Sequence, residues 1–196
     1  MKKIVFSIIL LVGFVVSLTA QDLKDVSVEN IWKDYSFYSR TVNGVRSMND
    51  GVNYTSLDRT KVGNDLVKYS YTDANKMDVV IDNAKLVVDE KVVGIDDYEF
   101  SADESKVLIA SNTEEIYRHS SKSDYFIYEL SSQKLAKLSE GEQQMYATFS
   151  PKANKVAYVK ENNLYFKDLT TNKETQITTD GKKGAIINGA SDWVYE

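Results

Sequence analysis

The feature that most constrains the fold of this chain is an internal repeat. Residues 100–110 read FSADESKVLIA, and residues 149–159 read FSPKANKVAYV, 49 positions further along. Each copy has the pattern of a strand end, a polar turn and a second, β-rich strand. A second pair, residues 124–139 and 163–178, repeats a hairpin with a polar turn in its middle. Such a repeat indicates that one supersecondary unit is used several times.

A unit of about 40–50 residues with four short strands is typical of a β-propeller blade. A weaker third copy lies at residues 49–54 and 66–71, and Trp32 is expected in the core near its start. Three copies are too few to close a ring, since propellers take about 4–8 blades. We therefore predict an all-β chain that forms the first blades of a β-propeller, an incomplete ring, within a longer protein. The alternative is a β-sandwich with accidental similarity.

The two repeat pairs differ in their offset, which is 49 residues for the first and 39 for the second. Ten extra residues therefore fall between the second and third strands of one copy, near residues 112–121. Loops that break a repeat's length are frequent carriers of function, and Arg118 lies in this one. Its planar guanidinium can hold a carboxylate or a carbonyl. The alternative is a solvated arginine paired with Glu114 or Glu115.

The N-terminus has the pattern of a secretory signal peptide. Two lysines follow Met1, and residues 4–20 form an uncharged run that ends at Asp22. We predict a signal peptide over residues 1–20, a propeller portion over residues 21–196, and an exported protein in the periplasm or outside the cell. The alternative is an uncleaved membrane anchor, since a membrane span takes about 20 apolar residues.

Composition excludes several classes of site. The chain has no cysteine, so disulfides, thiolate metal sites and cysteine nucleophiles are excluded. Its net charge is −5 and no basic block stands out, which argues against nucleic acid as a partner. No spacing matches an EF-hand loop, and no G-x-S-x-G nucleophile motif is present. We predict no metal site, no cofactor and no catalytic residue in this chain.

Two motifs carry a family resemblance, YRHS at residues 117–120 and NGASDWVYE at residues 188–196. Between them, residues 125–130, 149–159 and 162–165 follow in the same order as in the family. In this arrangement the chain resembles the dipeptidyl peptidase IV family of the prolyl oligopeptidase class. The ending DWVYE is specific, whereas the FSP-type motif is common to many propellers.

The resemblance implies an eight-bladed propeller followed by a C-terminal α/β-hydrolase domain that holds the catalytic serine, aspartate and histidine. It implies that Arg118 helps to hold the substrate's backbone carbonyl. Glu196 matches the first glutamate of an acidic run that holds the substrate's α-ammonium, and the two glutamates that bind the amine would follow it. The substrate-binding candidates are therefore Arg118 and Glu196. His119, the only histidine, is interpreted as a loop residue and not as a catalytic base.

The function implied is the removal of Xaa-Pro or Xaa-Ala dipeptides from peptide N-termini by a secreted serine exopeptidase. The propeller would gate access and position the substrate, and this chain alone would be inactive. The expected partners are peptides with a free N-terminus, the hydrolase domain of the same full-length protein and a second copy in a homodimer. The alternative is a non-catalytic periplasmic propeller that binds protein or glycan.

Overall fold

A computed structural model describes residues 23–39, 44–73 and 75–195 of a chain that divides into two units, Met1–Val42 and Asn43–Glu196. The predicted signal peptide and Glu196 lie outside the described residues. The described part of the first unit contains one short π-helical turn, η1 (Glu29–Lys33), which buries no residue. Trp32 lies in this turn and is 72% exposed, so the prediction that it belongs to the core is wrong. No helix in the described part of the chain is long and apolar enough to cross a membrane.

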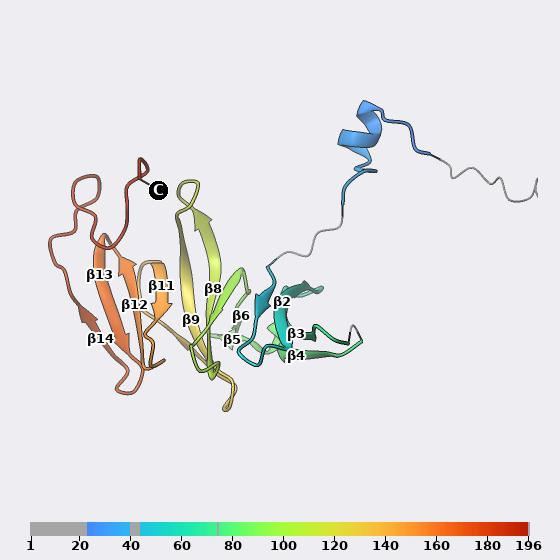
Figure 1. Cartoon of the computed structure of the whole chain (residues 1–196). Coiled ribbons are helices and arrows are strands. Elements are labelled where there is room, and N and C mark those ends of the chain that lie inside the picture. The colour runs from blue at the N-terminus through green and yellow to red at the C-terminus, as the bar shows by residue number, and fades with distance from the viewer. Residues whose placement is uncertain (1–22, 40–43, 74, 196) are drawn as a thin grey trace, which may run out of the picture. The chain divides into compact units, whose positions relative to one another are not determined.

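The second unit contains three four-stranded antiparallel sheets, each with its strands in chain order (Figure 1). We call these sheets blades 1, 2 and 3. Blade 1 consists of β1 (Arg46–Ser47), β2 (Asn53–Arg59), β3 (Asn64–Ser70) and β4 (Met77–Ile81). Blade 2 consists of β7 (Asp97–Phe100), β8 (Lys106–Glu115), β9 (Ser121–Glu129) and β10 (Lys134–Lys137). Blade 3 consists of β11 (Met145–Phe149), β12 (Lys155–Lys160), β13 (Asn163–Asp168) and β14 (Lys173–Gln176).

Between blades 1 and 2 the chain forms a short 3-10 helix, η2 (Asn83–Lys85), and a two-stranded hairpin of β5 (Val87–Val88) and β6 (Lys91–Val92). Three sheets of this kind are an incomplete propeller. The predicted all-β fold, with the first blades of a β-propeller, is therefore confirmed.

The sequence repeat is also a repeat of hydrogen bonds. The Ser101 N–H donates to the carbonyl of Lys106 at 2.9 Å, and the Ser150 N–H donates to the carbonyl of Lys155 at 2.8 Å. The two serine hydroxyls accept from the N–H groups of the same lysines, at 3.0 and 3.1 Å. Serine side chains of this kind satisfy backbone groups that a tight turn leaves open. The turns after β7 and β11 are therefore closed in the same way.

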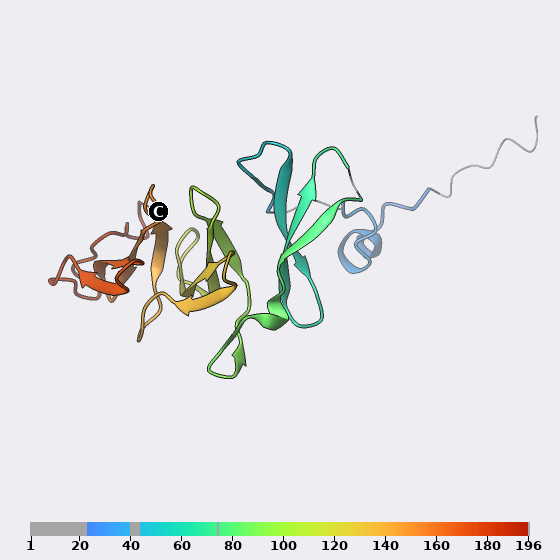
Figure 2. The same cartoon turned by 90° about the horizontal axis from the view of Figure 1, so that it is seen from below.

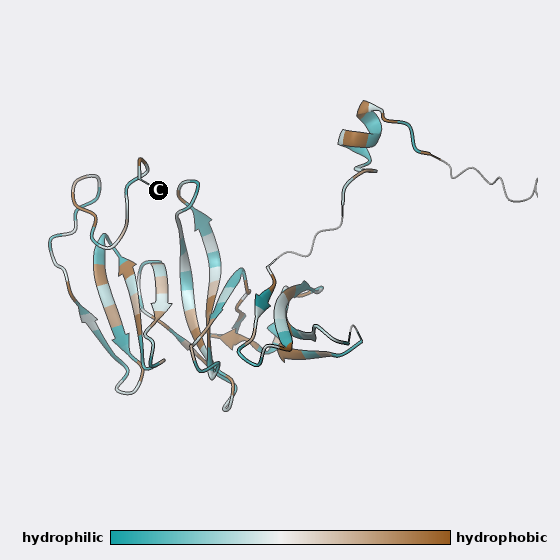
Figure 3. Ribbon diagram, viewed as in Figure 1, coloured by the Kyte–Doolittle hydropathy of each residue, from teal (hydrophilic) through white to brown (hydrophobic). Residues whose placement is uncertain are grey.

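Side chains alternate along the strands of blade 2, so both of its faces carry residues that pack against a neighbouring blade. On β8, Val107 and Ile109 belong to the core cluster shared with blade 1, whereas Leu108 belongs to the cluster shared with blade 3. Figure 2 shows blade 2 between its two neighbours. Figure 3 shows the alternation as brown and teal bands along β12 and β13 of blade 3. Face-to-face packing of this kind is what joins the blades.

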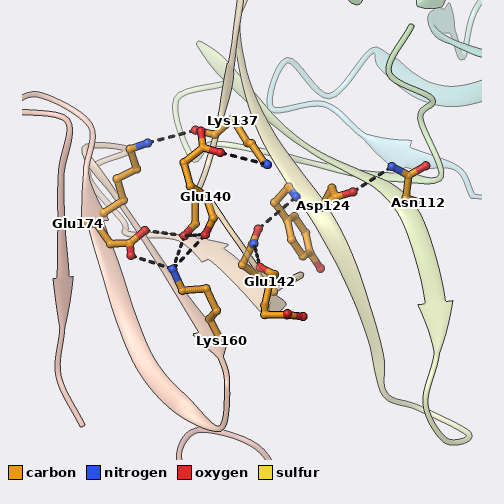
Figure 4. A network of polar contacts seen from close by, with 11 residues as sticks. Asn112, Asp124, Lys137, Glu140, Glu142, Lys160 and Glu174 are labelled. Carbon is orange, nitrogen blue, oxygen red and sulfur yellow. Dashed lines mark hydrogen bonds and ion pairs between the residues drawn. The ribbon is translucent and has the colours of Figure 1, made fainter. Parts of the chain in front are cut away.

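Polar contacts also join blades 2 and 3 (Figure 4). The Lys160 ammonium donates to Ser139 Oγ at 2.7 Å and to Glu174 Oε1 at 2.9 Å. The Tyr158 hydroxyl, on a side chain that is almost fully buried, donates to Glu174 as well. Ser139 follows blade 2 and the other three residues belong to blade 3. This network fixes the connection between the two blades.

Candidate functional site

The hairpin of β8 and β9 extends well beyond the rest of blade 2. Its pairing runs from Lys106 and Glu129 to Glu115 and Ser121. At the tip, the Ile116 N–H donates to the carbonyl of Ser120 at 2.9 Å and closes a three-residue loop with Arg118 at its centre. The extra residues do lie in this hairpin, but most of them lengthen its strands: residues 112–115 belong to β8, and only residues 116–120 lie between β8 and β9.

Arg118 is exposed at this tip. The ion pairs found among the described residues do not include it. Glu114 instead accepts from Lys122 at 2.8 Å, and this hydrogen bond raises the pKa of Lys122 above its ordinary value, although desolvation acts to lower it. The alternative was a solvated arginine paired with Glu114 or Glu115: Arg118 is solvent-exposed, and neither glutamate forms an ion pair with it among the described residues. The guanidinium is available to a ligand.

The segment after blade 3 folds back onto the turn between β12 and β13. The Gly181 N–H donates to Asn163 Oδ1 at 2.9 Å, and the Asn188 N–H donates to the carbonyl of Asn162 at 3.0 Å. A Cβ atom at Gly181 would lie 2.4 Å from that same carbonyl oxygen, so only glycine allows this approach. These contacts fix the start of the C-terminal segment.

The end of this segment forms a turn around Asp192. Its carboxylate accepts from the backbone N–H groups of Val194 at 3.0 Å and of Tyr195 at 3.3 Å. This is the local bond by which an aspartate starts a turn. Trp193 is 69% exposed and Tyr195 is 83% exposed. The turn therefore presents aromatic side chains directly before Glu196.

The hairpin tip and the C-terminal segment line one groove of about 880 Å³. The tip contributes Tyr117 and Ser120, and the C-terminal segment contributes Trp193. The Ser120 hydroxyl oxygen is buried and has no hydrogen-bond partner in the described part of the chain. Figure 1 shows the tip of β8 and β9 beside the C-terminal end.

A smaller pocket of about 340 Å³ adjoins both segments and is lined by His119, Tyr146, Gly189, Ala190, Ser191 and Tyr195. Tyr117 and His119, on either side of Arg118, line the larger and the smaller cavity respectively. Trp193 lines the larger cavity and Tyr195 the smaller one, shortly before Glu196. The structure brings together the two motifs that the sequence singled out. The position of Glu196 itself lies outside the described residues.

No group of three or more histidine, aspartate or glutamate side chains in the described residues is placed to hold a metal ion. Sequence reasoning missed the residues at the base of the hairpin, where Asn112 has a φ of +52° and the strand pairing shifts by one residue. The pairs Ser111–Asp124 and Glu114–Lys122 enclose two residues on β8 and one on β9, and this mismatch is the mark of the bulge. It is visible only once the pairing is known.

Comparison with known proteins shows which proteins the chain is similar to. Residues 101–196 match the family model described as "Dipeptidyl peptidase IV (DPP IV) N-terminal region". Probable dipeptidyl-aminopeptidase B from Podospora anserina is 42% identical over 100 residues, which are 49% of this chain and 11% of that protein. Dipeptidyl peptidase 4 from Trichophyton equinum is 40% identical over 117 residues, which are 58% of this chain and 15% of that protein.

Among solved structures, that of dipeptidyl peptidase 4 from Porphyromonas gingivalis superposes with a TM-score of 0.75 at 34% sequence identity. The match covers 89% of this chain and 25% of that chain. The chain therefore spans between 11% and 25% of the length of the proteins that it matches here. The matching sequence, the matching fold and the three blades identify the chain as an N-terminal propeller portion of a dipeptidyl peptidase IV-like protein.

Proposed function

We propose that this chain is the N-terminal propeller part of an exported serine exopeptidase that removes Xaa-Pro or Xaa-Ala dipeptides from peptides with a free N-terminus. One observation carries the proposal. The hairpin tip that bears Arg118 and the segment that leads to Glu196 line the same groove. The loop that carries Arg118, which has no ionic partner among the described residues, thus lies beside Trp193 and Tyr195, the residues shortly before Glu196.

The two candidate residues have complementary tasks. The guanidinium of Arg118 donates hydrogen bonds to a backbone carbonyl of the substrate, for which its fork of donors is suited. Glu196 begins the acidic run that receives the substrate's α-ammonium. A blocked N-terminus carries no charge, so it would leave desolvated carboxylates without a partner. This cost restricts the enzyme to free N-termini.

The chemistry belongs to the rest of the protein. A serine of the C-terminal α/β-hydrolase domain in the same full-length chain attacks the peptide carbonyl, and an acyl-enzyme forms and is hydrolysed. The propeller gates access so that only short or flexible peptide ends reach the serine. Residues 1–20 direct export to the periplasm or the exterior, and the full protein forms a homodimer. The reaction takes no cofactor and no nucleic acid.

The test is to express the full reading frame and to measure cleavage of a Gly-Pro-linked chromogenic amide by the wild type, Arg118→Ala and Arg118→Lys. We expect Arg118→Ala to lose about 1–3 kcal/mol of transition-state stabilisation, the range for a hydrogen bond to a charged group. Arg118→Lys keeps the charge and loses the fork, so it should recover only part of the loss.

An N-acetylated version of the same amide is the substrate control, and we expect it to remain uncleaved. Cleavage of both amides at equal rates would rule out recognition of the free N-terminus. A well-folded full-length protein that cleaves neither amide would overturn the peptidase and leave a propeller that binds protein or glycan. Full activity of Arg118→Ala would remove Arg118 from the site while leaving the peptidase intact.

A further inference from the structure

The hairpin that carries Arg118 contains a β-bulge at its base. Ser111 on β8 faces Asp124 on β9, and Glu114 faces Lys122, so β8 has one residue more than β9 between these pairs. Asn112 lies in the bulge with a φ of +52°, a left-handed conformation that asparagine tolerates better than most residues. A bulge bends its strand and increases the local twist, and bulges often redirect side chains next to active sites.

Three hydrogen bonds hold this bulge. The Asn112 side-chain amide donates to Asp124 Oδ2 at 2.9 Å, which Figure 4 shows. The Thr113 N–H donates to Asp96 Oδ2 at 2.8 Å, and the Gln143 side-chain amide donates to the carbonyl of Asn112 at 2.7 Å. We call these five residues the bulge clamp. Its members come from the segment before β7, from both strands of the hairpin and from the connection to blade 3.

The connection to blade 3 reinforces the bulge clamp. Gln144, which is fully buried, forms two backbone hydrogen bonds of 2.9 Å with Ser123, the residue of β9 opposite the bulge. The Ser123 hydroxyl also lies 2.9 Å from that of Thr113. The base of the hairpin is therefore attached to blade 3, whose following segment lines the other side of the groove.

Beyond the bulge, the strand pairing of the hairpin is short. Only two residue pairs follow, Glu114 with Lys122 and Glu115 with Ser121, before the loop that carries Arg118. Side chains alternate along a strand with a period of two, so one extra residue changes the face on which every later side chain of β8 lies. The bulge therefore determines the direction in which the hairpin tip runs and the face of the hairpin on which the later side chains of β8 lie.

We propose that the bulge clamp positions the loop that carries Arg118 beside the groove, which makes Asn112 and Asp124 positioning residues for the substrate. This inference rests on the proposed function, because it assigns the clamp's effect to the contact that Arg118 makes with a substrate carbonyl. The clamp residues touch the bulge and not the substrate, so their effect passes through Arg118.

The experiment is a double-mutant cycle in the full-length protein, with kcat/KM for the Gly-Pro amide as the readout. Asp124→Ala removes the acceptor for the Asn112 amide, whereas Asp124→Asn keeps an oxygen at that place. We expect Asp124→Ala to lower kcat/KM about three- to tenfold, the range for one hydrogen bond. Asp124→Asn should retain most of the activity. In an Arg118→Ala background, Asp124→Ala should lower kcat/KM less than about twofold, because coupled residues are not additive.

Equal losses from Asp124→Ala with and without Arg118 would overturn the inference, as would an Asp124→Asn variant as impaired as Asp124→Ala. If the full-length protein cleaves no amide, the proposed function fails and amide hydrogen exchange over residues 113–121 becomes the readout. Faster exchange in Asp124→Ala than in Asp124→Asn then supports the clamp, and equal exchange overturns it.

Discussion

At the scale of single residues, Glu174 shows how hydrogen bonds can outweigh burial. Partial burial acts to raise the pKa of this carboxyl, yet hydrogen bonds from Ser139, Tyr158 and Lys160 lower it below its ordinary value. The Lys160 side chain is only 11% exposed, so Glu174 is the partner that keeps its charge satisfied. Removing that partner would leave an ammonium largely desolvated, which is costly.

We therefore expect Glu174→Gln to lower the free energy of unfolding by about 1–2 kcal/mol near neutral pH. The matched control is Glu140→Gln in the same network. The Glu140 side chain is 88% exposed and contacts Lys137 at 3.2 Å, so its loss should cost no more than about 0.5 kcal/mol. Urea unfolding at one fixed chain concentration measures both. Equal costs for the two variants would contradict this account.

The same network predicts a dependence on pH. Because the folded-state pKa of Glu174 is lowered, its stabilisation is fully present above the ordinary value of 4.5 and is lost as pH falls through the folded-state pKa. The difference in urea midpoint between the wild type and Glu174→Gln should therefore shrink when pH is lowered from 7 to below 4.5. A difference that stays constant over this range would show that the carboxylate's charge is not what stabilises the fold.

At the scale of elements, the repeat extends to backbone conformation. Gln133 and Asn172 occupy equivalent turns, after β9 and after β13, and both have left-handed φ angles, of 55° and 56°. Both side chains are exposed, so the effect of a substitution on the free energy of unfolding depends mainly on how well the new residue adopts the left-handed conformation. Asparagine tolerates this conformation better than glutamine.

A reciprocal exchange tests this equivalence. We expect Gln133→Asn to raise the free energy of unfolding and Asn172→Gln to lower it, each by about 0.5–1 kcal/mol. Urea unfolding of the two single variants beside the wild type gives the signs. Changes of the same sign would mean that side-chain contacts, and not the backbone conformation, govern the two turns.

The elements also show what the sequence could predict. The repeat offsets located the turns at Ser101 and Ser150 and the long hairpin that carries Arg118, because these depend on local residues and on spacing. The bulge at Asn112 was not predicted, because its contacts come from Asp96 and Gln143, which pairing alone brings near. Trp32 was misplaced because an aromatic residue next to a repeat was assumed to share its core.

At the scale of the whole molecule, an incomplete propeller leaves blade faces without a neighbouring blade. On blade 1, Val79 pairs with Val67 and Met77 pairs with Tyr69, so these four share one face. The opposite face carries Leu66, which packs in the core shared with blade 2. Val79 and Met77 are 52% and 54% exposed. Exposed apolar faces and open sheet edges promote association.

We therefore expect the chain of 196 residues, produced alone, to associate in solution, and Val79→Lys to shift it toward the monomer. Val92→Lys is the matched control, since Val92 is 48% exposed but lies on the β5–β6 hairpin and not on the blade face. Both substitutions add the same charge, so a general gain in solubility would affect them equally. Sedimentation velocity over a range of concentrations measures the outcome. If the wild-type chain sediments as a monomer throughout, or if both variants shift alike, the open face of blade 1 is not what drives association.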